Sequence, residues 1–181
     1  ICIGDSVLIG SAGQAGYVYS WRELSSTTEI GDKAKIYVQP TTRSEYILSV
    51  ERKTTGCTDA DTIAVEVNML PMANAGNDTS ICDGQQLQIG STAQTGHSYE
   101  WTSQPAGFTS SLAAPIVQPN DTIAYFLKQT IDSTGCFIND MLEVGVWITP
   151  RPSLSGDSLL CNNAMAEYIT KASSQNSFKW N

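Results

Sequence analysis

Apolar residues along this chain recur with a period near two, in short stretches separated by Gly, Pro, Asn, Asp, Ser and Thr. That pattern is typical of β-strands and does not favour long helices. It predicts strands over Val7–Ile9, Tyr17–Trp21, Ile36–Val38, Tyr46–Val50 and Ile63–Val67, and again over Leu87–Ile89, Ser98–Thr102, Ile116–Val117, Ile123–Gln129 and Leu142–Ile148.

The two sets of strands belong to an internal repeat. A cysteine precedes a tryptophan by 19 residues three times, and further motifs, such as Thr-Gly-Cys, recur at offsets of 79 or 80. A fixed period of this kind indicates tandem structural units. We therefore expect a first unit over residues 1–70 without its first strand, a complete second unit over 71–150, and the start of a third over 151–181.

Short strands with turn signals every 8 to 12 residues, in units of about 80 residues, predict an all-β fold of tandem antiparallel β-sandwich domains. Side chains alternate along a strand, so Tyr99 and Trp101 point to the same side and are expected in one core. The repeat extends the same role of core aromatic residue to Trp21 and Trp180.

Each complete unit carries one early cysteine and one in a Thr-Gly-Cys turn, and the chain has five in all: Cys2, Cys57, Cys82, Cys136 and Cys161. Regular placement in small domains indicates disulfides formed in an oxidising compartment. We expect Cys2 with Cys57 and Cys82 with Cys136, which would attach each hairpin to the start of its own unit. Spacing leaves open a pairing of neighbours, Cys57 with Cys82 and Cys136 with Cys161.

Composition and charge exclude several classes of function. The net charge is −8, hydrophobic residues make up 41% and charged residues 15% of the chain. An acidic chain without a basic stripe argues against nucleic-acid binding, and the apolar content argues against disorder. No apolar run approaches the roughly 20 residues of a membrane span. The single histidine, His97, occupies the place of Tyr17 in the first unit, so we expect no catalytic residue, no metal centre and no enzyme activity.

One stretch of the second unit has a familiar sequence. Ala73–Gln85, followed by Leu87–Ser91, Tyr99–Trp101, Gln118–Pro119 and Gly135–Cys136, resembles the PKD-like or Ig-like tandem repeats of large Bacteroidota surface proteins. Such repeats occur in gliding-motility adhesins and in cargo of type IX secretion. The resemblance implies export to the bacterial cell surface and a long array of units.

Aspartate is followed by Ser or Thr more often than composition predicts. Five of these pairs resemble the O-glycosylation acceptor of Bacteroidota, which implies glycans on Ser6, Thr62, Thr122, Ser133 and Ser158. The alternative is that Asp-Ser and Asp-Thr are favourable turn pairs, because their side chains bind nearby backbone.

Calcium at domain junctions is a further expectation. Carboxylates and amides in turns can hold Ca²⁺ where several converge, although solvated turn residues are the commoner case. The candidates are Asp78, Asp83, Asn120, Asp121, Asp132 and Asp140.

These observations favour a mechanical role, as a segment of an extracellular stalk, filament or adhesin. Its partners would be neighbouring repeats of the same chain, other copies in a filament, or surface glycans. The alternatives are a carbohydrate-binding module that uses Tyr17, Tyr37 or Trp147, and a spacer within a secreted hydrolase.

Overall fold

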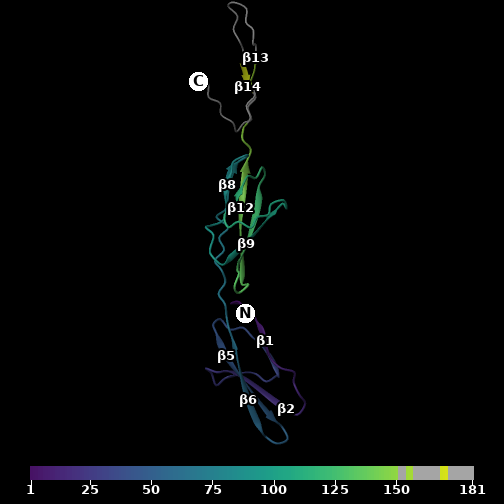
Figure 1. The fold of residues 1–181 in the computed structure, drawn as a ribbon. Coiled ribbons are helices and arrows are strands. Elements are labelled where there is room, and N and C mark those ends of the chain that lie inside the picture. Colours follow the sequence, from purple (N-terminus) through teal and green to yellow (C-terminus); the bar gives the residue numbers. More distant parts are fainter. Residues whose placement is uncertain (151–153, 157–167, 171–181) are drawn as a thin grey trace, which may run out of the picture.

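The structure is a computed structural model that describes residues 1–150, 154–156 and 168–170 of the chain. Every regular element within these ranges is a β-strand, as the alternating pattern predicts. In Figure 1 the two units lie end to end, and the N-terminus lies between them.

The first unit contains six strands, arranged as two sheets. A four-stranded sheet has the order β3-β2-β5-β6, and β1 pairs with β4 in a second sheet. The bounds are β1 Val7–Gly10, β2 Tyr17–Glu23, β3 Glu29–Gly31, β4 Lys35–Val38, β5 Ser44–Arg52 and β6 Thr58–Val65. Of these six strands, only β3 was not expected from the sequence.

The second unit also has six strands; it adds β7, which the sequence did not predict, and has an isolated bridge between Trp101 and Ser110 where the first unit has β3. A four-stranded sheet has the order β7-β12-β11-β9, and β8 pairs with β10. The bounds are β7 Thr79–Cys82, β8 Leu87–Gln88, β9 His97–Gln104, β10 Ile116–Val117, β11 Ile123–Ile131 and β12 Phe137–Trp147. Further along the chain, β13 (Leu154–Gly156) pairs with β14 (Tyr168–Thr170).

Each unit encloses its own core between its two sheets. In the first, Ile9 and Val38 of the small sheet meet Trp21, Tyr46 and Val65 of the large one. In the second, buried residues alternate with exposed ones along β9 and β11. The alternation buries one face of each strand and leaves the other to solvent, which makes each unit a β-sandwich.

One pairing departs from the antiparallel expectation. Strand β7 runs parallel to β12, and Cys82 lies opposite Trp147. The start of the first unit is attached in the same way, because Cys2 lies opposite Asn68 in a parallel bridge. The early cysteine of a unit therefore lies beside the place where the chain leaves that unit.

Candidate functional site

The most distinctive chemical feature lies where the two units meet. Residues Ile1–Ile3 are attached to the end of the first unit by backbone hydrogen bonds. The Ile3 amide donates to the carbonyl of Asn68 (2.9 Å), and the Asn68 amide donates to the carbonyl of Ile1 (2.8 Å). This ladder presents Cys2 at the end of the unit from which the linker departs.

On the side of the second unit, the turn between β11 and β12 lies at the place where the units meet. Gly135 has a φ of 74°, and its amide donates to the Ile131 carbonyl (2.8 Å). The Cys136 amide donates to the Thr134 hydroxyl (3.3 Å). Glycine is suited to this turn because other residues resist a positive φ. The turn thereby directs Cys136 toward the first unit.

A disulfide joins Cys2 to Cys136 across this boundary, with a Cα–Cα distance of 5.6 Å. The Cys136 side chain is fully buried. We call the region of Ile1–Ile3, Asn68–Met72 and Asp132–Cys136 the joint. Two covalent connections cross the joint, the linker and the disulfide, so the units cannot bend apart or rotate freely about the linker alone.

This bond corrects the pairing expected from the sequence. Cys136 is bonded to Cys2, so it is available neither to Cys82 nor to Cys161. Cys2 is likewise not bonded to Cys57. The hairpin of the second unit is thus attached to the start of the preceding unit, and not to the start of its own.

Strand length explains why the pairing within a unit fails. Cys82 lies opposite the last residue of β12, whereas Cys136 directly precedes its first. Eleven residues at about 3.3 Å each place these cysteines roughly 35 Å apart, while a disulfide requires a Cα–Cα distance of about 5.5 Å. The two cysteines of one unit lie at opposite ends, and only units stacked end to end can bring two such cysteines together.

Cys57 and Cys82 are free and exposed in this structure. Cys57 occupies the β5–β6 turn, and Cys82 ends β7 opposite Trp147, at the outer end of the second unit. Cys161 lies outside the described residues.

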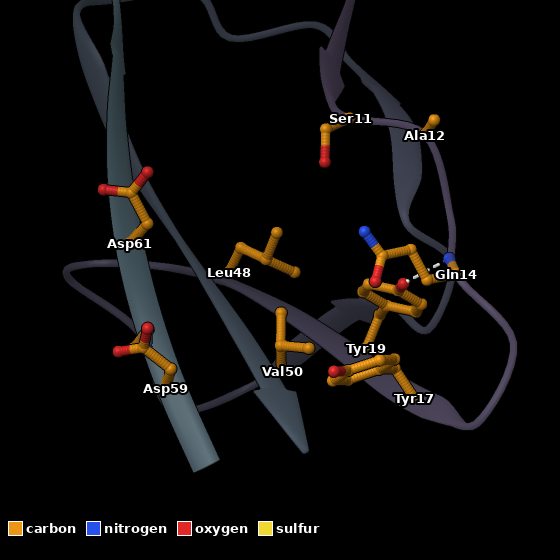
Figure 2. Close-up of a pocket in the computed structure, with 10 residues that line it drawn as sticks. Ser11, Ala12, Gln14, Tyr17, Tyr19, Leu48, Val50, Asp59 and Asp61 are labelled. Carbon is orange, nitrogen blue, oxygen red and sulfur yellow. Dashed lines mark hydrogen bonds between the residues drawn. The ribbon is translucent and has the colours of Figure 1, made fainter. Parts of the chain in front are cut away.

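A second feature is a hollow of about 310 Å³ in the first unit (Figure 2). Leu48 and Val50 form its floor. Asp59 and Asp61 of β6 line one side, and Tyr19 lines the opposite side. An adjoining hollow of about 260 Å³ continues it past Leu48 and Asp61 to Gly10, Trp21 and Ile63. We call the two hollows together the first-unit groove.

The core tryptophans lie at equivalent places. Trp21 is 3% exposed and Trp101 is 0% exposed. Their indole N–H groups donate to the carbonyls of Lys33 and Leu112, both at 2.9 Å. Trp180 lies outside the described residues.

Four of the expected glycosylation positions lie within the part of the chain that the structure describes. Ser6, Thr62, Thr122 and Ser133 are all exposed. The structure also shows the turn chemistry of the alternative interpretation, because the Thr62 amide donates to the Asp61 carboxylate at 2.8 Å. Ser158 lies outside the described residues.

Several of the acids considered for calcium bind backbone amides. Asp140 accepts from Ala75 (2.8 Å), Asp78 accepts from Glu143 (2.7 Å), and Asp83 accepts from Thr149 (2.6 Å). Among the described residues, no three His, Cys, Asp or Glu side chains converge as a metal site. The sequence did not reveal these hydrogen bonds, because each joins residues 65 or 66 positions apart.

The residues considered for catalysis or carbohydrate binding do not lie together. His97 lies 2.8 Å from the Gln129 side-chain nitrogen, so it belongs to a polar contact inside the second unit. Tyr37 is 73% exposed on the first unit, and Trp147 is 68% exposed at the far end of the second. They lie on different units and share no platform.

In the part of the chain that the structure describes, three groups have shifted pKa values. Burial raises the pKa of the Tyr46 and Tyr125 phenols above their ordinary value. Hydrogen bonds to Glu45 and Glu66 raise the pKa of the Arg43 guanidinium, which is exposed. These shifts describe packing and surface ion pairs, and none of them creates an acid or base suited to catalysis near neutral pH.

Comparison with known proteins concerns the fold. No protein-family model matches the chain, and no curated protein is significantly similar to it. Solved structures that resemble it include the fibronectin(III)-like modules of CbhA from Clostridium thermocellum (9% identity, TM-score 0.39, covering 81% of this chain and 88% of that one). The three N-terminal domains of the Highly Immunogenic Outer Capsid protein of bacteriophage RB49 are 12% identical (TM-score 0.37, 95% and 66% covered). Drosophila N-cadherin EC1-3 is also 12% identical (TM-score 0.34, 75% and 57% covered).

The strands and sheets of this chain themselves show that its units have an all-β sandwich fold. Within the described ranges, no helix is long and apolar enough to cross a membrane. The disulfide and the fold are compatible with an extracellular domain.

Proposed function

We propose that this chain is a load-bearing segment of a long bacterial cell-surface protein, a stalk, filament or adhesin, in which Ig-like or PKD-like repeats are locked end to end. The observation that carries the proposal is the Cys2–Cys136 disulfide across the joint. A bond within a unit stabilises only that unit, whereas a bond between units sets the angle between them. The role is mechanical, not enzymatic, and needs no cofactor.

Rigidity follows from attachment at two points. Pro71 is buried in the linker, where its ring fixes φ and removes a donor. The disulfide adds a second connection on the Cys2 strand. A chain with a single linker bends about that linker, but two separate connections restrict both bending and twisting.

The lock is suited to repetition along an array. The Cys82 amide donates to Gln85 (3.0 Å) as the Cys2 amide donates to Asp5 (3.2 Å). The Asp83 amide donates to the Trp147 carbonyl (2.9 Å), which repeats the bond from Ile3 to Asn68. Cys82 is therefore presented at the outer end of the second unit as Cys2 is presented at the joint.

The turn of the first unit is a copy of the turn that carries Cys136. The Gly56 amide donates to the Arg52 carbonyl at 2.8 Å, and the Cys57 amide donates to the Thr55 hydroxyl at 3.4 Å. In the proposed array, the early cysteine of each repeat binds the Gly-Cys turn of the next. Cys82 and Cys57 would then each bond a further repeat, and Cys161 would continue the series.

A chain lengthened from its own sequence tests this arrangement. Residues 72–150 appended after Pro150 create a third repeat, because Pro150 occupies the place of Pro71. Disulfide mapping by mass spectrometry should find Cys2–Cys136 and a bond from Cys82 to the Gly-Cys turn of the added copy. Bonds within units, or between Cys57 and Cys82, would contradict the proposal.

Shape provides the direct functional measurement. Small-angle scattering of the 181-residue protein should show a stiff rod when oxidised and a bent, broader distribution after reduction. Cys57→Ser is the matched control, because it removes a thiol that forms no bond here. Identical scattering before and after reduction would show that the disulfide does not set the angle.

Surface glycans belong to the same proposal. Ser6, Thr62, Thr122 and Ser133 are exposed, and sugars there would hydrate the rod and shield its strand edges. Glycopeptide mapping of the protein from its native source should find a hexose-containing modification on at least one of them. A bare polypeptide mass from that source would remove glycosylation from this account.

A further inference from the structure

A separate hollow of about 450 Å³ lies in the second unit, beside the buried Tyr125. The loop that follows β9, residues 105–108, lines it, as does the turn between β10 and β11, residues 118–122. On its wall, the rings of Phe108 and Tyr125 meet edge to face, with centroids 5.2 Å apart. Its volume is within the range of small-molecule sites, about 300–1,000 Å³. We call it the Tyr125 hollow.

Hydrogen bonds hold both walls of the hollow in place. Ser103 is 8% exposed, and its hydroxyl donates to the Pro105 carbonyl (2.7 Å). The same hydroxyl accepts from the Phe108 amide (3.1 Å). On the other side, the Gln118 side-chain amide donates to the Gly84 carbonyl (2.7 Å). The hollow is therefore formed in the absence of a ligand, as most small-molecule sites are.

The polar group of the hollow is the Tyr125 hydroxyl. Tyr125 is 2% exposed, and burial raises the pKa of its phenol. The hydroxyl has no hydrogen-bond partner among the described residues. Within the same residues, no fully buried side-chain nitrogen or oxygen lacks a partner, so the hydroxyl keeps contact with the hollow that Tyr125 lines. It can donate one hydrogen bond there and accept another.

The first unit provides a protein partner for the equivalent phenol. Tyr46 occupies the place of Tyr125 in the repeat, and Ser44 occupies the place of Ile123. Burial raises the pKa of the Tyr46 phenol, and a side-chain hydrogen bond with Ser44 opposes that rise. Ile123 has no hydroxyl and cannot form such a bond. In the second unit, the phenol is therefore left for a partner from outside the protein.

We propose that the Tyr125 hollow binds a neutral sugar residue, such as the terminal residue of a glycan. The site goes beyond the mechanical role, because it gives the second unit a ligand of its own. The phenol donates to a sugar oxygen at the inner end of the hollow. Phe108 and Ile123 offer apolar surface to the C–H face of the sugar ring.

Polar groups at the hollow define the charge of the ligand. Asn120 and Asp121 are exposed and line it, and neither side chain has a hydrogen bond within the part of the chain that is described. Together they can accept from and donate to neighbouring sugar hydroxyls. None of the described residues that line the hollow is basic. An anionic ligand would lose water without gaining a cationic partner, which disfavours it.

Titration of the 181-residue protein with simple sugars tests the site. The probes are the methyl glycosides of glucose, galactose, mannose and N-acetylglucosamine, and the readout is the NMR signals of isoleucine methyl groups. At least one probe should shift the signals of Ile116 and Ile123, which line the hollow, until they saturate. The signal of Ile47 in the first unit should not move. The uronic-acid counterpart of a sugar that binds should bind more weakly, because it carries a negative charge.

Matched variants assign the binding to the hollow. Tyr125→Phe removes a hydroxyl that has no partner in the described protein, so the variant should fold normally, while its affinity for the sugar falls roughly 3- to 10-fold. Asp121→Ala changes an exposed side chain and should weaken binding by a similar factor. Tyr46→Phe makes the same change in the first unit and should leave the affinity unchanged.

Three results would overturn the proposal. The first is that none of the four glycosides shifts the signals of Ile116 and Ile123, including the case in which a proline-rich peptide shifts them instead. The second is an affinity that neither Tyr125→Phe nor Asp121→Ala lowers. The third is an equal loss of affinity in Tyr125→Phe and Tyr46→Phe. None of these results bears on the disulfide at the joint, because the hollow and the joint use different residues.

Discussion

The inter-unit disulfide makes a quantitative prediction about stability. If the first unit unfolds while the second stays folded, its chain becomes a closed loop, attached to the second unit at Cys136 through Cys2 and at Pro71 through the linker. That loop holds about 70 residues, for which the chain-entropy relation gives roughly 4 kcal/mol. Unfolding of the second unit alone closes a loop of similar length, from Asn68 to Cys136.

Removal of the bond should therefore weaken both units by a similar amount. Cys136→Ser should lower the free energy of unfolding of each by about 4 kcal/mol, which moves a urea midpoint down by roughly 2–4 M. Hydrogen exchange resolved by mass spectrometry, with peptides from β5 and from β11, reports the two units separately in one titration.

The controls follow from the same geometry. Cys57→Ser and Cys82→Ser remove thiols that form no bond here, so they should leave both midpoints unchanged. Reduction should lower the midpoints of the parent protein and leave those of Cys136→Ser where they are. The reasoning fails if Cys136→Ser destabilises only the second unit, because a bond that crosses the joint must act on both.

Other perturbations probe the units themselves. Gly90→Ala should destabilise the second unit by about 3 kcal/mol, because a Cβ there would overlap the Ala113 carbonyl at a positive φ. The control is Gly84→Ala, which is also at a positive φ but in open space and should cost about 1 kcal/mol. Equal denaturation midpoints for the two variants would exclude the overlap. Burial raises the pKa of the Tyr125 phenol, so the unfolded chain releases that proton at a lower pH than the folded protein does. The free energy of unfolding should therefore fall as the pH rises past about 10. Melting measured as a function of pH should show a smaller fall for Tyr125→Phe. A chelator should leave the melting temperature unchanged, since several junction carboxylates are bound to backbone amides. A lower melting temperature after chelation would indicate that the protein binds calcium. Trp147→Ala should not alter binding on a glycan array, and a loss of binding would support the carbohydrate-binding alternative.

Local features of the fold could be read from the chain before the structure. Period-two alternation located ten of the strands to within a few residues, because one face of each strand is buried and the other is not. The equal spacing of Cys2 from Trp21 and of Cys82 from Trp101 showed the repeat, since equivalent residues must keep the same distance along equivalent strands. The hydrophobic pattern gave no sign of β3 or β7, which have three and four residues.

Disulfide pairing and the groove depended on contacts between distant parts of the chain. Spacing gives the distance along the chain between cysteines but not the direction in which β7 runs, and that parallel direction puts Cys82 and Cys136 at opposite ends of one unit. Likewise, Asp61 and Asp140 occupy the same place in the repeat, yet Asp61 accepts from the amide of its neighbour Thr62, whereas Asp140 accepts from the amide of Ala75, 65 residues away. The sequence by itself determined ten of the strands, the repeat and the residues that belong to the cores, because these follow from local periodicity. Only the tertiary structure decided which cysteine meets which, because strand direction and end-to-end stacking are set by packing between segments far apart in the chain.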